Sequence, residues 1–328
     1  MHKPPKDNYN GISYETMQEL EFERQRINKK LSYILYFSIF ISFILTFLFG
    51  YFFDELGFIR TLILVLPIFL IVFSILYPLI NSDVSNIKPK FKHAVIEKIV
   101  KDINPNFAYR PTSSIGEKEF FKPNLYNRAQ ETWWFKGDDF IDGRHNGVYF
   151  RMSDIDYYVL RSAGRSVYAK HLFLGIVFIA KFYKFFNSRV YIIRKNKDTG
   201  YTRNYGKKIN IDNVEFSEQY DVYADDEISA FYILSHSFME DFLNLAKRMK
   251  CEINAVFYRD NLYLYINNRR ENFEIDFGIS QTLIPIIYRT HKKMILEILK
   301  IIDDLNLNSK VFKPSLGGNS GENLSENS

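Results

Sequence analysis

The chain has 328 residues, a formal net charge of +5 and a single cysteine. One cysteine excludes an internal disulfide and is typical of a protein in a reducing compartment. The positive charge is too small and too dispersed for a nucleic-acid-binding surface, so we expect no nucleic acid partner. The length leaves room for one large domain or two small ones beside any membrane segment.

Residues 1–30 are polar and charged. Thr16 and Glu19 have the spacing of a helix capping box, and acidic residues then precede basic ones, which suits the helix dipole. We expect a cytoplasmic N-terminal segment with an amphipathic helix. That helix either continues as a solvated extension into the apolar run that follows, or forms a short coiled coil or a docking helix.

Two long apolar runs, residues 31–53 and 61–80, contain no charged side chain. A helix needs about 20 apolar residues to cross the hydrocarbon core of a bilayer, which is about 30 Å thick. The polar joint at 54–60 can turn the chain around but cannot cross back. We therefore expect a two-helix transmembrane hairpin over residues 31–80. The alternative is a buried core hairpin, but core helices of this length rarely lack a polar face.

Basic residues cluster on the outer flanks of this hairpin. Because positive flanking charge stays on the cytoplasmic side of a membrane, we expect a multi-pass protein of a bacterial inner membrane with both termini in the cytoplasm. The residues concerned are Arg24, Arg26, Lys29, Lys30, Lys88, Lys90, Lys92 and Lys98.

Small polar residues and prolines mark the interior of the apolar runs. Ser38, Ser42 and Thr46 follow one side of the first run and predict a helix–helix contact there. Pro67 and Pro78 predict a kink in the second run. Because the runs contain no ionisable side chain, an anchoring role is favoured over a homo-oligomeric channel.

The rest of the chain, residues 81–307, predicts a cytoplasmic α+β domain with a mostly antiparallel sheet and packed helices, because short strands alternate with tight turns and amphipathic helices. Asn146-Gly147 between apolar stretches predicts a hairpin turn. Residues 308–328 predict a disordered tail. Strands are expected at 148–152, 156–160, 172–182, 189–194 and 220–223, a hairpin at 251–258 and 262–266, and helices at 227–249 and 282–305.

Catalytic patterns are absent from the sequence: it has no phosphate-binding loop, no dinucleotide fingerprint, no zinc-protease motif and no paired cysteines. We therefore predict no catalytic residue, and the sequence leaves any cofactor unknown. Asp138, Asp139 and Asp142, between two glycines, are candidate ligands of a divalent cation. The alternative is a strand edge with outward-pointing carboxylates. Cys251 is expected to be a small buried hydrophobe rather than a nucleophile.

Gly137-Asp138-Asp139-Phe140-Ile141-Asp142-Gly143 and Tyr220-Asp221-Val222-Tyr223-Ala224-Asp225-Asp226 each begin a group of segments. These two groups resemble a bacterial family of two-span membrane proteins known as the domain of unknown function 3137. The resemblance covers roughly residues 90–280, and it implies an architecture but no activity and no site residues. Phe173-Leu174-Gly175 departs from the Phe-Lys-Gly that members usually show. The matching segments are 137–143, 148–155, 173–182, 220–226, 230–234, 238–239 and 261–266.

These patterns together predict a membrane-anchored binding or scaffold domain. Its expected partners are the lipid bilayer and a protein or small ligand, and a homo-oligomer is compatible with the sequence. The alternative is a membrane-tethered enzyme of unrecognised type, such as a metal-assisted hydrolase that uses Asp138, Asp139 and Asp142.

Overall fold

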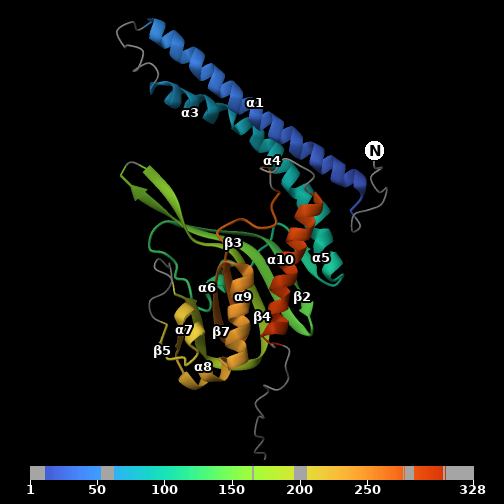
Figure 1. Cartoon of the computed structure of the whole chain (residues 1–328), viewed down its shortest axis with the longest axis vertical. Helices are drawn as coiled ribbons and strands as arrows, with labels where there is room; N and C mark the ends of the chain where they lie inside the picture. Colours follow the sequence, from blue (N-terminus) through green and yellow to red (C-terminus); the bar gives the residue numbers. More distant parts are fainter. Residues whose placement is uncertain are drawn as a thin grey trace, which may run out of the picture. The chain divides into compact units, whose positions relative to one another are not determined.

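A computed structural model describes residues 12–52, 63–164, 166–195, 205–275, 277, 284–305 and 307 of the chain (Figure 1). The chain divides into two compact units. We call them the helical unit (Met1–Pro111 and Asn272–Leu296) and the sheet unit (Thr112–Glu271 and Glu297–Ser328). The joint at 54–60 and the tail at 308–328, both predicted from the sequence, lie outside the described residues.

Helix α1 of the helical unit runs without a break from Tyr14 to Phe52. The N-terminal amphipathic segment therefore continues into the first apolar run, as one of the two alternatives predicted. Helix α3 (Val65–Leu76) and helix α4 (Pro78–Phe91) follow, and the chain bends by 45° between them. The bend lies at Pro78, which supplies no backbone N–H, so the predicted kink is confirmed.

A single turn of π-helix (Lys92–Ile96) joins α4 to α5 (Glu97–Ile103), and a short strand, β1 (Ala108–Arg110), ends this part of the unit. The sequence predicts one helix over residues 91–102, and the structure has a helical segment there that extends back through α4. The inserted π turn has no sequence signal that we recognise.

Helix α1 packs antiparallel along α4. The Lys30 ammonium donates to the Leu79 carbonyl and lies 2.8 Å from Asp83, whereas Glu23, one heptad earlier in α1, lies 2.6 Å from Lys90. The small polar stripe of α1 is buried at Ser38, Ser42 and Thr46, which confirms the predicted helix contact. The Ser38 and Ser42 hydroxyls donate to the carbonyls of the preceding helical turn, at Ile34 and Ser38.

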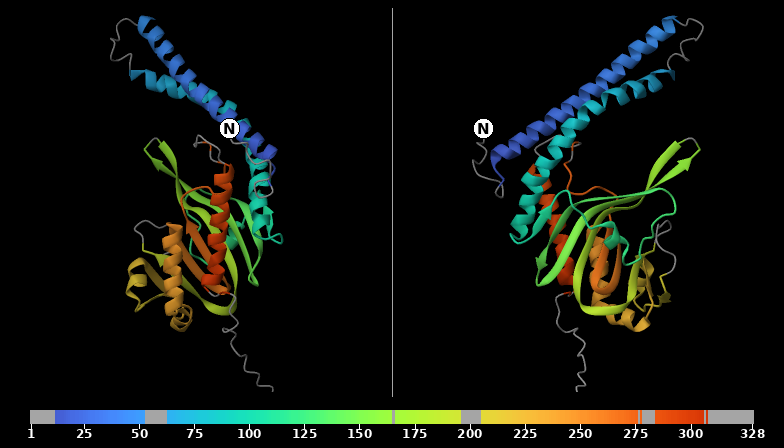
Figure 2. Two further views of the ribbon diagram at one scale, coloured as in Figure 1. Left: turned by 45° about the vertical axis from the view of Figure 1, so that its right-hand side comes forward. Right: turned by 180° about the vertical axis from the view of Figure 1, so that it is seen from behind.

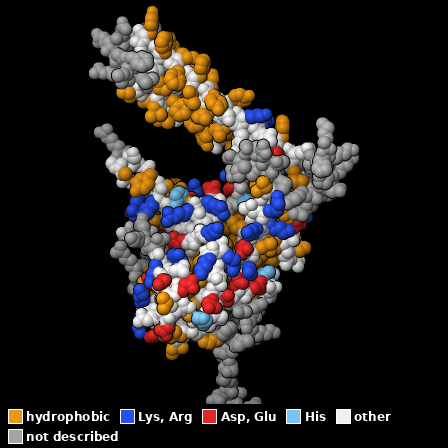
Figure 3. Space-filling model, viewed as in Figure 1, with side chains coloured by type: hydrophobic (Ala, Val, Ile, Leu, Met, Phe, Trp, Pro, Cys, Tyr) orange, Lys and Arg blue, Asp and Glu red, His pale blue; other side chains and the backbone are white. Residues whose placement is uncertain are grey.

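Hydrophobic side chains cover the outer surface of α1 and α3 (Figure 3). By length and composition, α1 is able to cross a membrane, and α3 with its bent continuation qualifies only if that pair is counted as one span. The described residues thus supply one candidate membrane span, or two if the bent pair is included.

The sheet unit is built on an antiparallel sheet whose strands run in the order β2-β3-β4-β6-β5, with β7 paired to the other edge of β4 (Figure 1). The predicted α+β class and antiparallel sheet are confirmed. Asn146 and Gly147, both with positive φ, make the predicted turn between β2 and β3. The strands are β2 (Trp133–His145), β3 (Val148–Ala163), β4 (Ser166–Arg194), β5 (Lys207–Ile209), β6 (Tyr220–Ala224) and β7 (Glu252–Asn267).

Strand β4 is the centre of the sheet. The two strands predicted at 172–182 and 189–194 are one strand, and the hairpin predicted at 251–266 is wrong because β7 pairs with β4 from Ala255 through Ile266. The polar residues around Asn261 resemble a turn in the sequence. In the structure they lie opposite an irregular stretch of β4 and form a β-bulge within β7, where Arg259 has φ +55°.

The single helix predicted at 227–249 is two helices, α8 (Glu227–Ile233) and α9 (His236–Met249). Leu234 leaves the helical conformation, and the Ser235 hydroxyl accepts a hydrogen bond from the Phe238 N–H and so begins α9. The Asp226 side chain accepts hydrogen bonds from the Ile228 and Ser229 N–H groups and so caps α8. The predicted C-terminal helix is confirmed as α10 (Ile284–Asp304), which continues along the chain from one unit into the other.

Both faces of the sheet are covered within the sheet unit (Figure 2). On one face, α9 packs Phe238 on Phe257 of β7 and Phe242 on Tyr220 of β6. On the other face, Phe120 of α6 (Glu117–Phe121) packs among aromatic rings of four strands. Those rings are Phe135, Tyr157, Phe173 and Tyr265.

Candidate functional site

A polar pocket opens where the end of β4, the end of α7 (Val214–Gln219), the end of α9 and the start of β7 meet. Its volume is about 470 Å³, which is within the range of small-ligand sites. Four of its eight lining residues are cationic and one is acidic. The lining residues are Arg194, Lys195, Gln219, Ala246, Lys247, Lys250, Cys251 and Glu252. We call it the basic pocket.

Hydrogen bonds hold the Arg194 side chain at the edge of the pocket. Its Nη1 donates to Gln219 Oε1 at 2.6 Å, and its guanidinium lies 5.2 Å from the centre of the Tyr220 ring. The backbone N–H of Arg194 donates to the buried side chain of Asn254, which fixes the end of β4 to β7. A guanidinium fixed in this way keeps its remaining donors oriented for an anion.

Two lysines of the pocket form ion pairs with carboxylates of the sheet unit. Lys195 lies 3.7 Å from Asp221, and Lys247 lies 2.7 Å from Glu215. These are largely exposed pairs, which contribute little to stability, so an anionic ligand would compete for the ammonium groups at small cost.

Lys250 is different, because among the described residues its ammonium has no hydrogen bond or ion pair. It ends α9 in the left-handed conformation, with φ 51° and ψ 35°. Glycine is the usual residue there because a Cβ in this conformation costs energy. A strained lysine that lines a pocket, with no partner in the part of the chain that the structure describes, is the kind of outlier that points to function.

Cys251 lies beside Lys250 and is half-buried. Burial raises the pKa of its thiol to about 11, so the thiol stays protonated near neutral pH and is a poor nucleophile. This agrees with the role predicted for the residue. The pocket therefore has the chemistry to bind an anion, but the described residues place no activated nucleophile in it.

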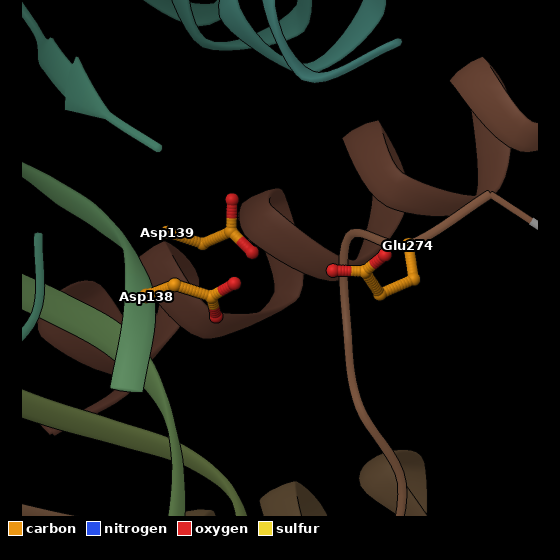
Figure 4. A group of neighbouring side chains, drawn as sticks. All are labelled: Asp138, Asp139 and Glu274. Atoms are coloured by element: carbon orange, nitrogen blue, oxygen red, sulfur yellow. The ribbon is translucent and has the colours of Figure 1, made fainter. Parts of the chain in front are cut away.

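The acidic residues of β2 lie elsewhere in the sheet unit. Asp138 and Asp139 have carboxylate oxygens within 4.8 Å of each other (Figure 4). A β-bulge brings them together, because two residues of β2 are accommodated opposite one of β3 between Asp138 and Ile141. Asp139 is buried and has φ 54°, which aspartate tolerates better than most residues.

Asp142 does not join this group among the described residues. It lies beyond the bulge, where its carboxylate accepts a hydrogen bond from the Tyr149 hydroxyl at 3.3 Å. Sequence reasoning missed Asp154, a buried residue directly opposite Asp138 in the register, because cross-strand neighbours are not visible before the strand pairing is known. The cation-binding role of Asp138, Asp139 and Asp142 stays a prediction.

Figure 4 also draws Glu274, which belongs to the helical unit. Its two carboxylate oxygens each lie 3.0 Å from a lysine of the same unit, Lys88 and Lys92. Lys92 is almost fully buried, so this carboxylate supplies its counter-charge.

Comparison with known proteins places part of the chain in a family. Residues 171–307 match the model of the family described as "Protein of unknown function (DUF3137)". This region belongs to the DUF3137 family. The match confirms the resemblance seen in the sequence, although it begins further along the chain, at β4.

The DUF3137 region contains every residue that lines the basic pocket and none of Asp138, Asp139 and Asp142. No curated protein matches the chain. Among solved structures, the chain resembles the crystal structure of the mycobacterial trehalose monomycolate transport factor A, TtfA. The identity is 8%, the alignment covers 63% of this chain and 92% of that one, and the TM-score of 0.33 is too low to support an argument.

Proposed function

We propose that the protein is a membrane-anchored binding protein. In this proposal α1 and the α3–α4 segment cross a bacterial inner membrane as a hairpin, both ends of the chain lie in the cytoplasm, and the sheet unit binds an anionic small ligand in the basic pocket. The observation that carries the binding role is the strained Lys250, which has no ion-pair partner among the described residues and lines a pocket with three further cations.

The anchor is supported by the distribution of side chains on α1. Polar residues are buried against the partner helices, and large apolar residues face outward, the reverse of a soluble helix. Exposed side chains of this kind include Phe40, Phe43, Phe47 and Leu48. In water such a surface would drive aggregation, whereas in hydrocarbon it carries no penalty.

Topology reporters test the anchor. A reporter enzyme fused after Ser328 is expected to be active in the cytoplasm and silent outside it, and the full chain should remain in the membrane after an alkaline carbonate wash. A reporter active outside the cytoplasm would contradict the orientation, and release by carbonate would contradict the anchor itself.

Anion titrations test the pocket. Inorganic phosphate and pyrophosphate would be titrated into the full chain in detergent, with binding followed by calorimetry. Lys250→Asn removes the charge but keeps a residue that tolerates the left-handed conformation, so we expect weaker binding, on the order of fivefold or more, without loss of stability. Lys118→Asn, which removes an exposed lysine of α6 outside the pocket, should bind as the wild type does.

Equal affinities for the wild type and Lys250→Asn would contradict the pocket proposal. Lys250→Gly also removes the ammonium group, and in addition it removes the conformational cost of the left-handed backbone. Comparison with Lys250→Asn therefore distinguishes the effect of the charge from that of the strain. We expect this variant to be more stable than the wild type by about 1 kcal/mol and to bind phosphate as weakly as Lys250→Asn does.

The metal-assisted enzyme remains the alternative, and the closeness of Asp138 and Asp139 is the observation that favours it. It requires a melting temperature that rises with Mg²⁺ or Mn²⁺ and an Asp138→Asn variant that no longer responds. A melting temperature independent of both metals would contradict this alternative.

A further inference from the structure

The distal parts of β3 and β4 form a two-stranded ribbon, residues 159–163 and 166–170, that projects from the sheet (Figures 1 and 2). Pairing of β2 with β3 ends at Val159, and pairing of β7 with β4 begins only at Ile176. Val159 still pairs with Trp133 of β2, and the Leu160 N–H donates to the Thr132 carbonyl at 3.0 Å. Beyond Leu160, among the described strands, the two halves of the ribbon pair only with each other. A two-stranded ribbon is marginal in water and has no core of its own.

The ribbon is amphipathic. Residues directly opposite in an antiparallel pair share a face of the sheet. Leu160 faces Ala169, and Ser162 faces Val167, which gives one largely apolar face. The other face carries the pairs Arg161–Tyr168 and Val159–Lys170, and it is basic and aromatic. Arg161 lies 3.4 Å from the Glu131 carboxylate, but both side chains are exposed, so an anionic surface would compete for the guanidinium at small cost.

Its apolar side chains are exposed rather than packed. The exposed fractions are 66% for Val167, 49% for Tyr168 and 36% for Leu160. Clustered exposed apolar residues on a projecting element mark a contact surface, and the nearby positive charges specify what it contacts.

A second exposed apolar patch of the sheet unit has the opposite charge. On α8, Ile228, Phe231 and Tyr232 are exposed beside the acidic run Asp225, Asp226 and Glu227. That patch would be repelled by an anionic surface, whereas Arg161 and Lys170 of the ribbon would be attracted to one.

We propose that the β3–β4 ribbon docks on an anionic lipid surface. Its apolar face enters the boundary between headgroups and acyl chains, Tyr168 lies at headgroup level, and Arg161 and Lys170 contact lipid phosphates. The contact area is small, so docking depends on the high effective concentration that a membrane tether supplies, and in that respect it rests on the proposed anchor.

Site-specific fluorescence tests the proposal, because Cys251 is the chain's single cysteine. In a Cys251→Ala background, Val167→Cys would carry an environment-sensitive fluorophore. The labelled full chain would be reconstituted into vesicles of phosphatidylcholine alone or with phosphatidylglycerol, with and without nitroxide-labelled lipids. We expect a blue shift and nitroxide quenching in the anionic vesicles, and loss of both with Arg161→Glu/Lys170→Glu.

Two further label positions separate the possible results. Ile228→Cys, on the acidic patch and 79% exposed, should stay in water in every vesicle. Phe43→Cys in α1 should be quenched in both lipid compositions, because it reports the anchor alone. An unquenched label at Phe43 would overturn the anchor rather than the ribbon contact.

With the α1 label quenched, a label at Val167 that stays in water in anionic vesicles would overturn the ribbon proposal. Equal quenching of this label in neutral and anionic vesicles would overturn the assignment to anionic lipid. Quenching at Ile228 as strong as at Val167 would likewise overturn the ribbon as the specific contact.

Discussion

Gly175 shows how a single residue determines the closeness of two strands. Its φ is +150°, and a Cβ added there would lie 2.2 Å from the carbonyl oxygen of Ile266 and 2.9 Å from Oδ1 of Asn268. The first of these contacts is with backbone, which cannot rotate away. The glycine of Phe173-Leu174-Gly175 therefore has a structural reason to be there: β4 and the end of β7 approach each other too closely for any side chain.

We predict that Gly175→Ala lowers the free energy of unfolding of the sheet unit by at least about 2 kcal/mol, because strain and clash act together. Thermal denaturation of the full chain in detergent would measure it. Gly116→Ala is the matched control, since a Cβ there meets nothing within 4 Å. If the free energy of unfolding fell equally in the two variants, the close approach of β4 and β7 at Gly175 would not be what requires glycine there.

Glu119 on α6 is a half-buried carboxylate in a polar network. It accepts hydrogen bonds from the Tyr263 hydroxyl at 2.8 Å and from Arg151 at 2.7 Å, and Lys122 lies 3.3 Å away. Burial alone would raise the pKa of this carboxyl, but the hydrogen bond from Tyr263 and the charges of Arg151 and Lys122 outweigh it. The pKa of Glu119 therefore lies below its ordinary value of 4.5.

A lowered pKa has a defined consequence for stability against pH. The contribution of Glu119 is present above its ordinary value of 4.5 and is lost as pH falls through the lower pKa of the folded state. We predict that Glu119→Gln is less stable than the wild type at neutral pH and loses less stability between about pH 5 and about pH 3. Parallel pH profiles for the wild type and Glu119→Gln would contradict this account.

At the scale of elements, the sequence predicts what local chemistry determines. The Asn146-Gly147 turn, the bend at Pro78 and the buried stripe of α1 each depend on a few neighbouring residues, and each is present. The length of β4 and the unity of β7 are not local properties. Both depend on which strands pair with them. From the sequence alone, the polar Arg-Asp-Asn stretch resembles a turn, and only the pairing of β7 with an irregular part of β4 shows that the strand continues through it.

The candidate sites follow the same division. Asp138 and Asp139 are adjacent in the sequence, so their proximity could be predicted, whereas Asp142 is carried away by a bulge that the sequence does not mark. The basic pocket was missed altogether because its cations come from the ends of β4 and α9, far apart along the chain. Lys250 in place of the usual helix-ending glycine, next to Cys251, is the one signal that could have indicated it.

The buried stripe of α1 gives a prediction for the helical unit. Ser42 is fully buried on α1, which packs on α3 and α4, so a large side chain there would push the helices apart. We predict that Ser42→Leu destabilises this packing by about 1–3 kcal/mol, the usual cost of overpacking. Phe43→Leu, at an outward position of the same helix, should change little. Equal thermal stability of these two variants in detergent would contradict the assigned helix interface.

At the scale of the whole molecule, residues that share a compact unit are not always neighbours in the sequence. The two segments of the helical unit flank the main segment of the sheet unit in the sequence. Helix α10 contributes to both units. The sheet unit nevertheless has its own two-sided core, built from aromatic residues of its own strands and helices. Separate cores indicate separate cooperative blocks, and α10 is a helix that contributes to both of them.

Hydrogen exchange followed by mass spectrometry would test this independence in the full chain. We predict that Ser42→Leu speeds amide exchange in α1, α3 and α4 while β4 and β7 exchange as in the wild type, and that Gly175→Ala does the reverse. The double variant should show the sum of the two patterns, because changes in different packing units couple by less than about 0.5 kcal/mol. Faster exchange of β7 in Ser42→Leu would mean that the units unfold together. Because α10 contributes to both units, we would then expect amide exchange to change at Leu299, which is buried in the part of α10 that belongs to the sheet unit.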